Sequence, residues 1–493
     1  MKNENDALNF QRLMSVDNFP EMSSTDLLSF LGQLIDLSFD LHEIDGLDKA
    51  IRIIDSIDNQ KFTSEQRAIF YYFAANAWSN KYEIARKSNP ANIKTWEFEP
   101  VELQKVVRYL RLSIKEEGLC SLNKIYRCNV FTNLANTFDT LGRFIEAIDY
   151  WNQSLKIDPD FGMTLGNAGM GYINYSTFIY NKNHQGAFIR YARIKLLKAI
   201  NTLPNIPEYS TPLKTFQKYL SYADEVIIGP KESKYLNKPS SLGRSQAEKY
   251  FRNWCLQNRL FLNPLNDLGT FPIAAQDSLI LPSMVTPINV GPRYQGIYNQ
   301  MKQEYVSARF LCYEGIMHYS LHFSDRKVVL FNTLDYPSYG LSIEKVKIAF
   351  RMAYSLFDKI AFFINEYFGI GKDSNNVYFK SIWFKKQKEI VDSVKERKNP
   401  PLRGLYWLSK DLFDKNGDEG FQESLEPEAQ DLYIIRNHLE HKYLKIHEML
   451  IQRPDDSLSD DLAYSIERKD FEHKTIKLLR MVRNSLIYLS LAI

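Results

Sequence analysis

The sequence predicts an all-α protein in which helical hairpins form the N-terminal part and a helical bundle forms the C-terminal part. Two observations carry this prediction. Apolar residues recur at three- and four-residue spacings along many segments, and one unit of about 34 residues has the pattern of a repeated helix–turn–helix. At 493 residues the chain is too long for one ordinary hydrophobic core, so two or three folded units are expected.

The clearest repeat spans residues 128–161, CNVFTNLANTFDTLGRFIEAIDYWNQSLKIDPDF. The small residues Ala135 and Ala147 stand where the two helices of a hairpin would cross, and Gly142 permits the turn between them. Pro159 stops the second helix. The unit resembles a tetratricopeptide repeat (TPR), whose signature positions hold Phe131, Leu134, Ala135, Phe138, Gly142, Phe144, Ala147, Trp151, Ser154 and Pro159.

Neighbouring segments continue this pattern. Further helices of the same kind are expected within residues 26–54, 71–87, 101–116 and 162–172. In the first of these segments, Ala50 stands at the crossing position of an earlier, degenerate hairpin. One repeat cannot bury its own apolar faces, so several neighbours should stack. We therefore expect residues 1–200 to form a TPR-like helical-hairpin solenoid.

The pattern changes after residue 200. Residues 201–300 contain the strongest turn signals, such as NKPSSLG and NPLNDLG, and only one helix is expected there, around SQAEKYFRNWCLQNRLF. This part reads as a connector or insert. Four long amphipathic helices are then expected over residues 301–323, 341–368, 428–450 and 468–493. They predict an α-helical bundle over residues 301–493.

The cysteines, the N-terminal residues and the apolar runs indicate where in the cell the protein is expected. Four cysteines, Cys120, Cys128, Cys255 and Cys312, show neither CxxC spacing nor a short disulfide framework. We expect them to be buried, reduced side chains, with no structural zinc. The start, MKNENDALNF, carries acids where a signal peptide requires a basic start, and no apolar run approaches the ~20 residues of a membrane span. A cytoplasmic protein with no membrane segment is expected.

The stretch RNHLEH, residues 436–441, is the densest cluster of groups that can bind phosphate or move protons. On a helical wheel one apolar stripe is formed by Leu432, Ile435, Leu439, Tyr443, Ile446 and Leu450. Asn437, His441 and Glu448 lie roughly 160° or more from the centre of that stripe. His441 is therefore a poor candidate for a core histidine. Two interpretations stay open, a solvated helix face and an active site.

The R-polar-x3-H pattern of RNHLEH resembles the motif of the HEPN superfamily. Together with YFRNWCLQNRLFLNPLND, MKQEYVSARFLCYEG and LRGLYWLSKDLF, the segment IIRNHLEHKYLKIHE is similar to the LA2681-like HEPN branch, in which tetratricopeptide repeats commonly precede the HEPN unit. HEPN proteins are helical bundles, often dimeric and often metal-independent ribonucleases. The resemblance implies a HEPN bundle over residues 301–493, with Arg436 and His441 as the catalytic pair and Asn437 as a supporting polar residue.

These residue types suit RNA cleavage without a metal. Histidine can exchange a proton near neutral pH, and arginine offers a fixed-charge fork to a phosphate. Arg436 and His441 are about 140° apart on an ideal helix, so one straight helix does not align them. A two-fold pair of helices could line one cleft with both residues. The resemblance thus implies a homodimer or a higher even-numbered oligomer.

Other residues near the motif are weaker candidates. Glu440 and His447 share the Arg436 side of the expected helix and could assist, although solvated charges are the simpler interpretation. Histidines and glutamates in HLEHKYLKIHE follow neither the HExxH nor the HxxEH order, so no metal site is expected. A later RNS, residues 483–485, lacks the histidine and is expected to be structural.

The stretch KSIWFKKQKEIVDSVKERK, residues 380–398, mixes aromatic residues with cations and could hold an RNA backbone. Its candidate RNA-binding residues are Lys380, Lys385, Lys386, Lys388, Lys395, Arg397 and Lys398. Ile382, Ile390 and Val394 also fit the apolar stripe of an ordinary amphipathic helix, and both interpretations stay open. An acidic segment follows at residues 411–431, with eight acids against one lysine.

Together these expectations describe an endoribonuclease of the toxin or antiviral-defence type that works without a cofactor. Its expected partners are an RNA substrate, a second copy of the chain, and an unknown protein or ligand that the repeats sense or recruit. The rival interpretation is a non-catalytic adaptor, in which the bundle dimerises and scaffolds protein partners. The two differ in whether His441 is required for activity but not for folding.

Overall fold

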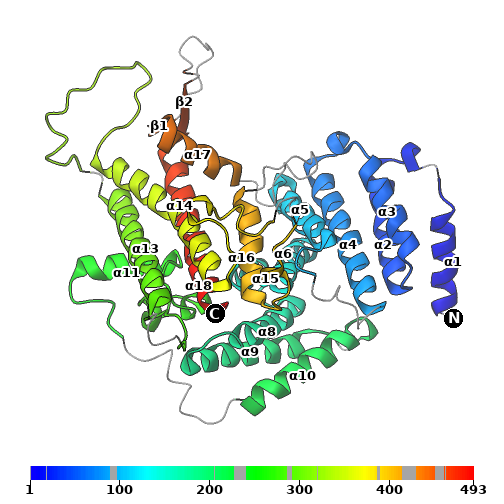
Figure 1. Ribbon diagram of the computed structural model, residues 1–493. Helices are drawn as coiled ribbons and strands as arrows, with labels where there is room; N and C mark the ends of the chain where they lie inside the picture. The colour runs from blue at the N-terminus through cyan, green and yellow to red at the C-terminus, as the bar shows by residue number, and fades with distance from the viewer. Residues whose placement is uncertain are drawn as a thin grey trace. The chain divides into compact units, whose positions relative to one another are not determined.

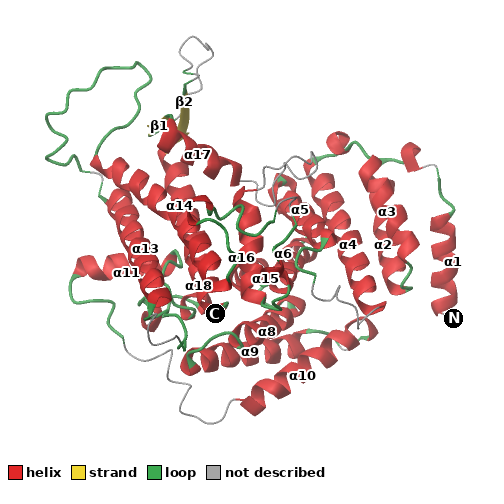
Figure 2. Ribbon diagram, in the orientation of Figure 1, coloured by secondary structure: helices red, strands yellow, loops and turns green. Residues whose placement is uncertain are grey.

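The computed structural model describes residues 2–17, 19–88, 97–204, 206–226, 240–285, 291–318, 320–385, 389–413, 429–449, 460 and 462–493. Helices dominate these residues, as Figure 2 shows, so the all-α class is confirmed. The chain divides into two compact units. The first consists mainly of residues 1–173 and 192–225, and the second mainly of residues 174–191, 226–424 and 428–493. No helix among the described residues has the length and apolar character to cross a membrane.

Consecutive helices pack in pairs in the first unit. They are α1 (Lys2–Met14), α2 (Ser24–Asp40), α3 (Ile44–Ser56), α4 (Ser64–Ser88), α5 (Val101–Lys115), α6 (Lys124–Thr140), α7 (Phe144–Ile157), most of α8 (Gly162–Ser176), the second half of α9 (Lys182–Thr202), and α10 (Ser210–Val226). The pairs α2–α3, α4–α5 and α6–α7 are in contact. The helices expected within residues 26–54, 71–87, 101–116 and 162–172 are all present. The prediction missed α10, which lies in the turn-rich part of the sequence.

One kind of turn closes two of these hairpins. Gly142 follows α6 with a φ of 82°, and His42 follows α2 with a φ of 61°. In both turns the next amide donates to a carbonyl near the helix end at 2.8 Å. A left-handed residue with such a bond is a helix C-cap that stops the helix and reverses the chain. The turn predicted at Gly142 is therefore confirmed, and the degenerate first hairpin uses a histidine instead.

Small residues let the hairpins of the first unit pack closely. Ala135 and Ala147 are completely buried where α6 and α7 cross, and Ala50 is buried in the same way on α3. Gly171 on α8 lies so near Trp151 of α7 that an added Cβ would come within 2.1 Å of the indole ring. The alanines that the sequence marked as crossing points are therefore buried, and Gly171 adds a close contact between neighbouring hairpins.

Three long helices form the centre of the second unit. α13 (Arg293–Met317), α14 (Leu341–Phe368) and α18 (Arg468–Leu491) pack against one another (Figure 1). α16 (Pro400–Phe413) packs on α18, and α17 (Ala429–His441) packs on both α14 and α16. Shorter helices are α11 (Gln246–Gln257), α12 (Leu265–Leu268) and α15 (Asp392–Lys395). The expected bundle is present, and it begins before residue 301.

The helix predicted over residues 428–450 is shorter than expected. α17 ends at His441, and strand β1 (Tyr443–His447) follows it. β1 pairs in parallel with β2 (Ala463–Glu467), and its side chains after the first are buried. Part of the apolar stripe therefore lies in the strand, namely Tyr443 and Ile446, while Leu450 lies outside the described residues. A stretch of five residues such as YLKIH fits both the helical and the strand period of apolar residues. It forms a strand here because β2, which is not adjacent in the sequence, pairs with it.

A buried ion pair joins the connector to α18. Arg483 and Asp267 are fully buried, and Nη1 of the arginine lies 2.5 Å from Oδ1 of the aspartate. Arg483 also donates from Nε to the Phe261 carbonyl at 2.7 Å and from Nη2 to the Asn263 carbonyl at 3.0 Å. The Tyr175 hydroxyl donates to the second oxygen of Asp267 at 3.2 Å. The structural role expected for RNS is confirmed, and part of the connector belongs to the core of the second unit.

Candidate functional site

RNHLEH occupies the last turns of α17, directly before β1 (Figure 1). Leu432, Ile435 and Leu439 are buried and anchor the helix in the bundle. Arg436 is only partly buried, and His441, the last helical residue, is exposed. His441 therefore lies on the free side of the helix, where the helical wheel predicted it.

Side chains from two helices surround Arg436. Its Nη1 donates to Oδ1 of Asn437 at 3.2 Å, and its guanidinium carbon lies 5.7 Å from the centre of the Tyr354 ring on α14. One turn further along α14 is the partly buried Asp358. Burial raises the pKa of Asp358, while its hydrogen bond from the Phe379 amide and the positive charge of Arg436 act to lower it. Arg436 thus donates to an amide and lies against an aromatic face, and its charge acts on the carboxyl group of Asp358.

The two histidines of the motif have different surroundings. Nδ1 of His438 lies 2.8 Å from the Ile434 carbonyl one turn back, and its ring centre lies 5.5 Å from that of Tyr464 on β2. The exposed His441 side chain makes no hydrogen bond or ion pair with any residue that the structure describes. Of these two rings, that of His441 is the more exposed and the one without a bond to another described residue.

The two candidate assisting residues are not on one helix face. Glu440 is exposed on α17, and its Oε1 lies 3.7 Å from Nε of Arg351. His447 is buried in β1, opposite Glu467 in the strand register. The prediction that His447 shares the Arg436 side of one helix is wrong, because the helix has ended; Glu448 also lies beyond it.

Residues 285–493 match the family model described as LA2681-like HEPN. This part of the chain is a HEPN domain. The matched residues include α13 to α18 and both strands, and therefore the whole RNHLEH motif. They begin after the hairpins of the first unit. No curated protein matches the chain, and no solved structure matches it.

The sequence alone did not reveal the contribution of α14 to this site of the HEPN domain. Besides Tyr354 and Asp358, α14 supplies Arg351, whose Nη2 donates to the carbonyl of Leu439 near the end of α17. The three α14 residues are spaced i, i+3 and i+7, so they share one helix face. α14 also carries many other polar residues, so the sequence offered no signal that singled out these three.

β1 is held where α17 ends. The hydroxyls of Tyr443 and Tyr339 are 3.0 Å apart, and this hydrogen bond raises the pKa of Tyr339 to about 12. The buried Lys445 forms an ion pair with Asp335 at 2.6 Å. The segment before α14 is therefore bonded to the strand that follows His441, which limits how far the end of α17 can move.

The basic stretch at residues 380–398 is not an amphipathic helix. An isolated antiparallel bridge joins Phe384 to Ile390, and the four-residue α15 follows. Trp383 is completely buried, so it cannot stack on a base. The described candidate cations are all exposed, namely Lys380, Lys385, Lys395, Arg397 and Lys398, whereas Lys386 and Lys388 lie outside the described residues. Most of the acidic segment at 411–431 also lies outside them.

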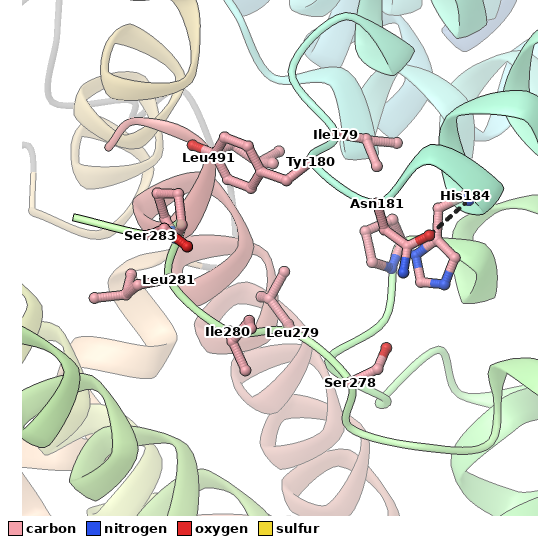
Figure 3. Close-up of a pocket in the computed structure, with 12 residues that line it drawn as sticks. Ile179, Tyr180, Asn181, His184, Ser278, Leu279, Ile280, Leu281, Ser283 and Leu491 are labelled. Carbon is pink, nitrogen blue, oxygen red and sulfur yellow. Dashed lines mark hydrogen bonds between the residues drawn. The ribbon is translucent and has the colours of Figure 1, made fainter.

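The second unit also contains a pocket of about 310 Å³ (Figure 3). It is lined by the turn between α8 and α9, by Pro264, by residues 278–283 and by Leu491. His184 lies in its wall, and burial lowers the pKa of this histidine to about 4, so the ring is neutral near pH 7. No residue of RNHLEH lines this pocket.

Neither cysteines nor carboxylates form a metal site in the described part of the chain. No group of three or more histidine, cysteine, aspartate or glutamate side chains there is arranged to hold a metal ion. Cys128, Cys255 and Cys312 are buried as expected, but Cys120 is exposed. The expectation of burial was therefore wrong for one of the four thiols.

Proposed function

We propose that this protein is a metal-independent endoribonuclease in which Arg436 and His441 are the catalytic pair. The observation that carries the proposal is the contrast between the two side chains on α17 of the HEPN domain. Arg436 is surrounded by groups that fix its guanidinium, and His441 is exposed at the helix end. A fixed guanidinium suits phosphate binding, and an exposed imidazole suits proton exchange.

The proposed reaction uses a nucleophile that RNA itself supplies. A histidine takes the proton of the 2′-hydroxyl of the RNA. The 2′-oxygen then attacks phosphorus, and the bond from phosphorus to the 5′-oxygen breaks. The leaving oxygen receives a proton from a second acid. Arg436 stabilises the negative charge on the pentacoordinate phosphate, with Asn437 holding one nitrogen of the fork. The products are a 2′,3′-cyclic phosphate and a 5′-hydroxyl.

A second copy of the chain would complete this site. Arg436 and His441 point about 140° apart on one helix, so a single α17 cannot direct both side chains at one phosphate. Two α17 helices facing each other about a two-fold axis would place two arginines and two histidines around one cleft. One His441 would then act as the base and the other as the acid.

RNA could approach this cleft along the basic stretch. The amide of Phe379 donates to Oδ1 of Asp358 at 3.0 Å, so the stretch starts beside the residues that surround Arg436. Lys380 is the next residue and is exposed. We assign the exposed cations of residues 380–398 to the RNA backbone, because phosphate contacts require charge but no fixed fold.

The helical hairpins of the first unit would regulate the ribonuclease by binding a protein or ligand trigger. Stacked helical repeats present extended surfaces that commonly bind partners. A ribonuclease under such control would suit a toxin or antiviral role, in which cutting host or invader RNA stops growth. A chain that binds partners but never cuts RNA would instead be the adaptor.

The proposal predicts cleavage that depends on the 2′-hydroxyl and not on a metal. Purified protein should cut RNA equally well with and without EDTA. DNA of the same sequence, and RNA methylated on the 2′-oxygen at the cut site, should stay intact because the nucleophile is missing. Cleavage can be followed with end-labelled oligonucleotides. Loss of cutting in EDTA, restored by Mg²⁺, would indicate metal-activated water instead.

A shared cleft predicts that one defective chain disables its partner. Wild-type and His441→Ala chains carrying different tags can be co-expressed, and the heterodimer can be purified through both tags. It should cut RNA at well under half of the wild-type homodimer rate, because both histidines serve one reaction. A heterodimer with half of the wild-type rate, or a fully active monomer, would show that each chain works alone.

A further inference from the structure

α14 presents one polar face to α17. Tyr354 and Arg351 on this face contact different parts of the motif, and the charge of Arg436 acts on Asp358. Tyr354 lies under the guanidinium of Arg436, at 5.7 Å from the guanidinium carbon to the ring centre. Asp358 lies one turn further along, and Arg351 one turn earlier. Because residues at i, i+3 and i+7 share a helix face, one rigid element aligns all three groups.

Two residues of this face, Tyr354 and Asp358, interact with Arg436. The ring of Tyr354 is buried, so it offers a rigid aromatic surface to the guanidinium. The Phe379 amide donates to Oδ1 of Asp358 at 3.0 Å and so holds the carboxyl group in place. The positive charge of Arg436 acts to lower the pKa of this group. A guanidinium held against a fixed ring, with a fixed carboxyl group that interacts with its charge, has fewer orientations available than a free one.

The Arg351 end of the face holds the terminus of α17. The last carbonyls of a helix have no partner within the helix, and a cation placed there is favourable. Arg351 donates from Nη2 to the carbonyl of Leu439, two residues before His441. Its Nε also lies 3.7 Å from Oε1 of Glu440. The backbone that carries His441 is thereby tied to the same helix that holds Arg436.

We infer that Arg351, Tyr354 and Asp358 on α14 are positioning residues, which set the guanidinium of Arg436 and the helix end that carries His441. This inference rests on the proposed ribonuclease function for its catalytic consequence. The three residues do not touch the phosphate in this role. They reduce the freedom of the two groups that do, and a small misplacement of a reacting group can cost a large factor in rate.

Asp358→Asn is the most informative variant, because the amide keeps the shape of the side chain and can still accept from Phe379. Tyr354→Leu removes the aromatic surface, and Tyr354→Phe keeps it. Ser355→Ala, on the exposed side of α14, is the matched control. Two quantities are measured in the full-length protein: kcat and KM for RNA, and the rate at which phenylglyoxal modifies Arg436, followed by peptide mass spectrometry.

Asp358→Asn and Tyr354→Leu should lower kcat by about tenfold to a hundredfold with little change in KM, and should speed the modification of Arg436. Tyr354→Phe and Ser355→Ala should behave as wild type in both assays. Arg351→Met should lower kcat without changing the modification rate, because it acts at the other end of α17. The modification assay needs no catalytic activity, so it tests the contacts by themselves.

The possible results separate the two proposals. If wild type cuts RNA, and Asp358→Asn and Tyr354→Leu match it in both assays, the positioning role is wrong while the ribonuclease stands. If wild type never cuts RNA but these two variants speed modification of Arg436, the positioning role stands and the ribonuclease fails. If Arg351→Met keeps the full kcat, Arg351 is not a member of the positioning set.

Discussion

Replacing His441 with alanine should lower kcat for RNA cleavage by about 10²–10⁴-fold, the range that a general acid or base typically contributes. The fold should not change, because the side chain is exposed at the end of α17 and makes no bond to another described residue. A surface substitution of this kind usually alters the free energy of unfolding by no more than about 0.5 kcal/mol. Cleavage rates, circular dichroism and thermal melting measure the two effects.

His473→Ala is the matched control for this experiment. His473 is another exposed histidine of the HEPN domain, on α18, and lies outside the proposed site. Its replacement should leave both cleavage and melting unchanged. If His441→Ala cuts RNA as fast as wild type, the assignment of His441 is wrong and the adaptor becomes the better interpretation of the HEPN domain.

Among the substitutions proposed here, Asp267→Ala should lower the free energy of unfolding the most. Arg483 would then be left fully buried without its carboxylate, and breaking a buried pair from one side typically costs about 3–5 kcal/mol. Tyr175 would also lose the acceptor of its hydroxyl. The free energy of unfolding, measured by urea titration, should fall accordingly, and the variant could fail to accumulate as folded protein.

The exposed pair of Lys385 and Asp392 provides the comparison for that loss. Both of its side chains are largely solvated, so solvent screens their attraction. Asp392→Ala should therefore shift the urea midpoint far less than Asp267→Ala. Equal shifts would mean that the Arg483–Asp267 pair does not hold the connector to α18.

Local sequence patterns predicted most of the helices and the place of His441. The crossing alanines, the Gly142 turn and the stripe of Leu432, Ile435 and Leu439 each depend on residues near one another in the chain. β1 could not be predicted in this way, because its partner β2 is not adjacent to it in the sequence and YLKIH fits a helical period as well. The buried Arg483–Asp267 pair was missed because its two residues are far apart in sequence.

In the candidate site, too, the sequence predicted the local motif but not the contacts between residues that are distant in the sequence. RNHLEH is a local motif, and the sequence alone picked out Arg436 and His441. The face formed by Arg351, Tyr354 and Asp358 became visible only when α14 was placed against α17. The basic stretch was misjudged as a possible helix because its apolar residues fit a helical stripe. Instead, Ile382 and Val394 are buried and Ile390 is partly buried beside a short bridge and α15.

The chemical end left at the cut tests the central claim most directly. RNA of defined sequence is cut by the wild-type protein in EDTA, and the upstream fragment is analysed by mass spectrometry. Attack by the 2′-hydroxyl, with Arg436 stabilising the phosphate and His441 moving protons, predicts a 2′,3′-cyclic phosphate or the monophosphate formed by its hydrolysis. An upstream fragment that ends in a 3′-hydroxyl would contradict this mechanism.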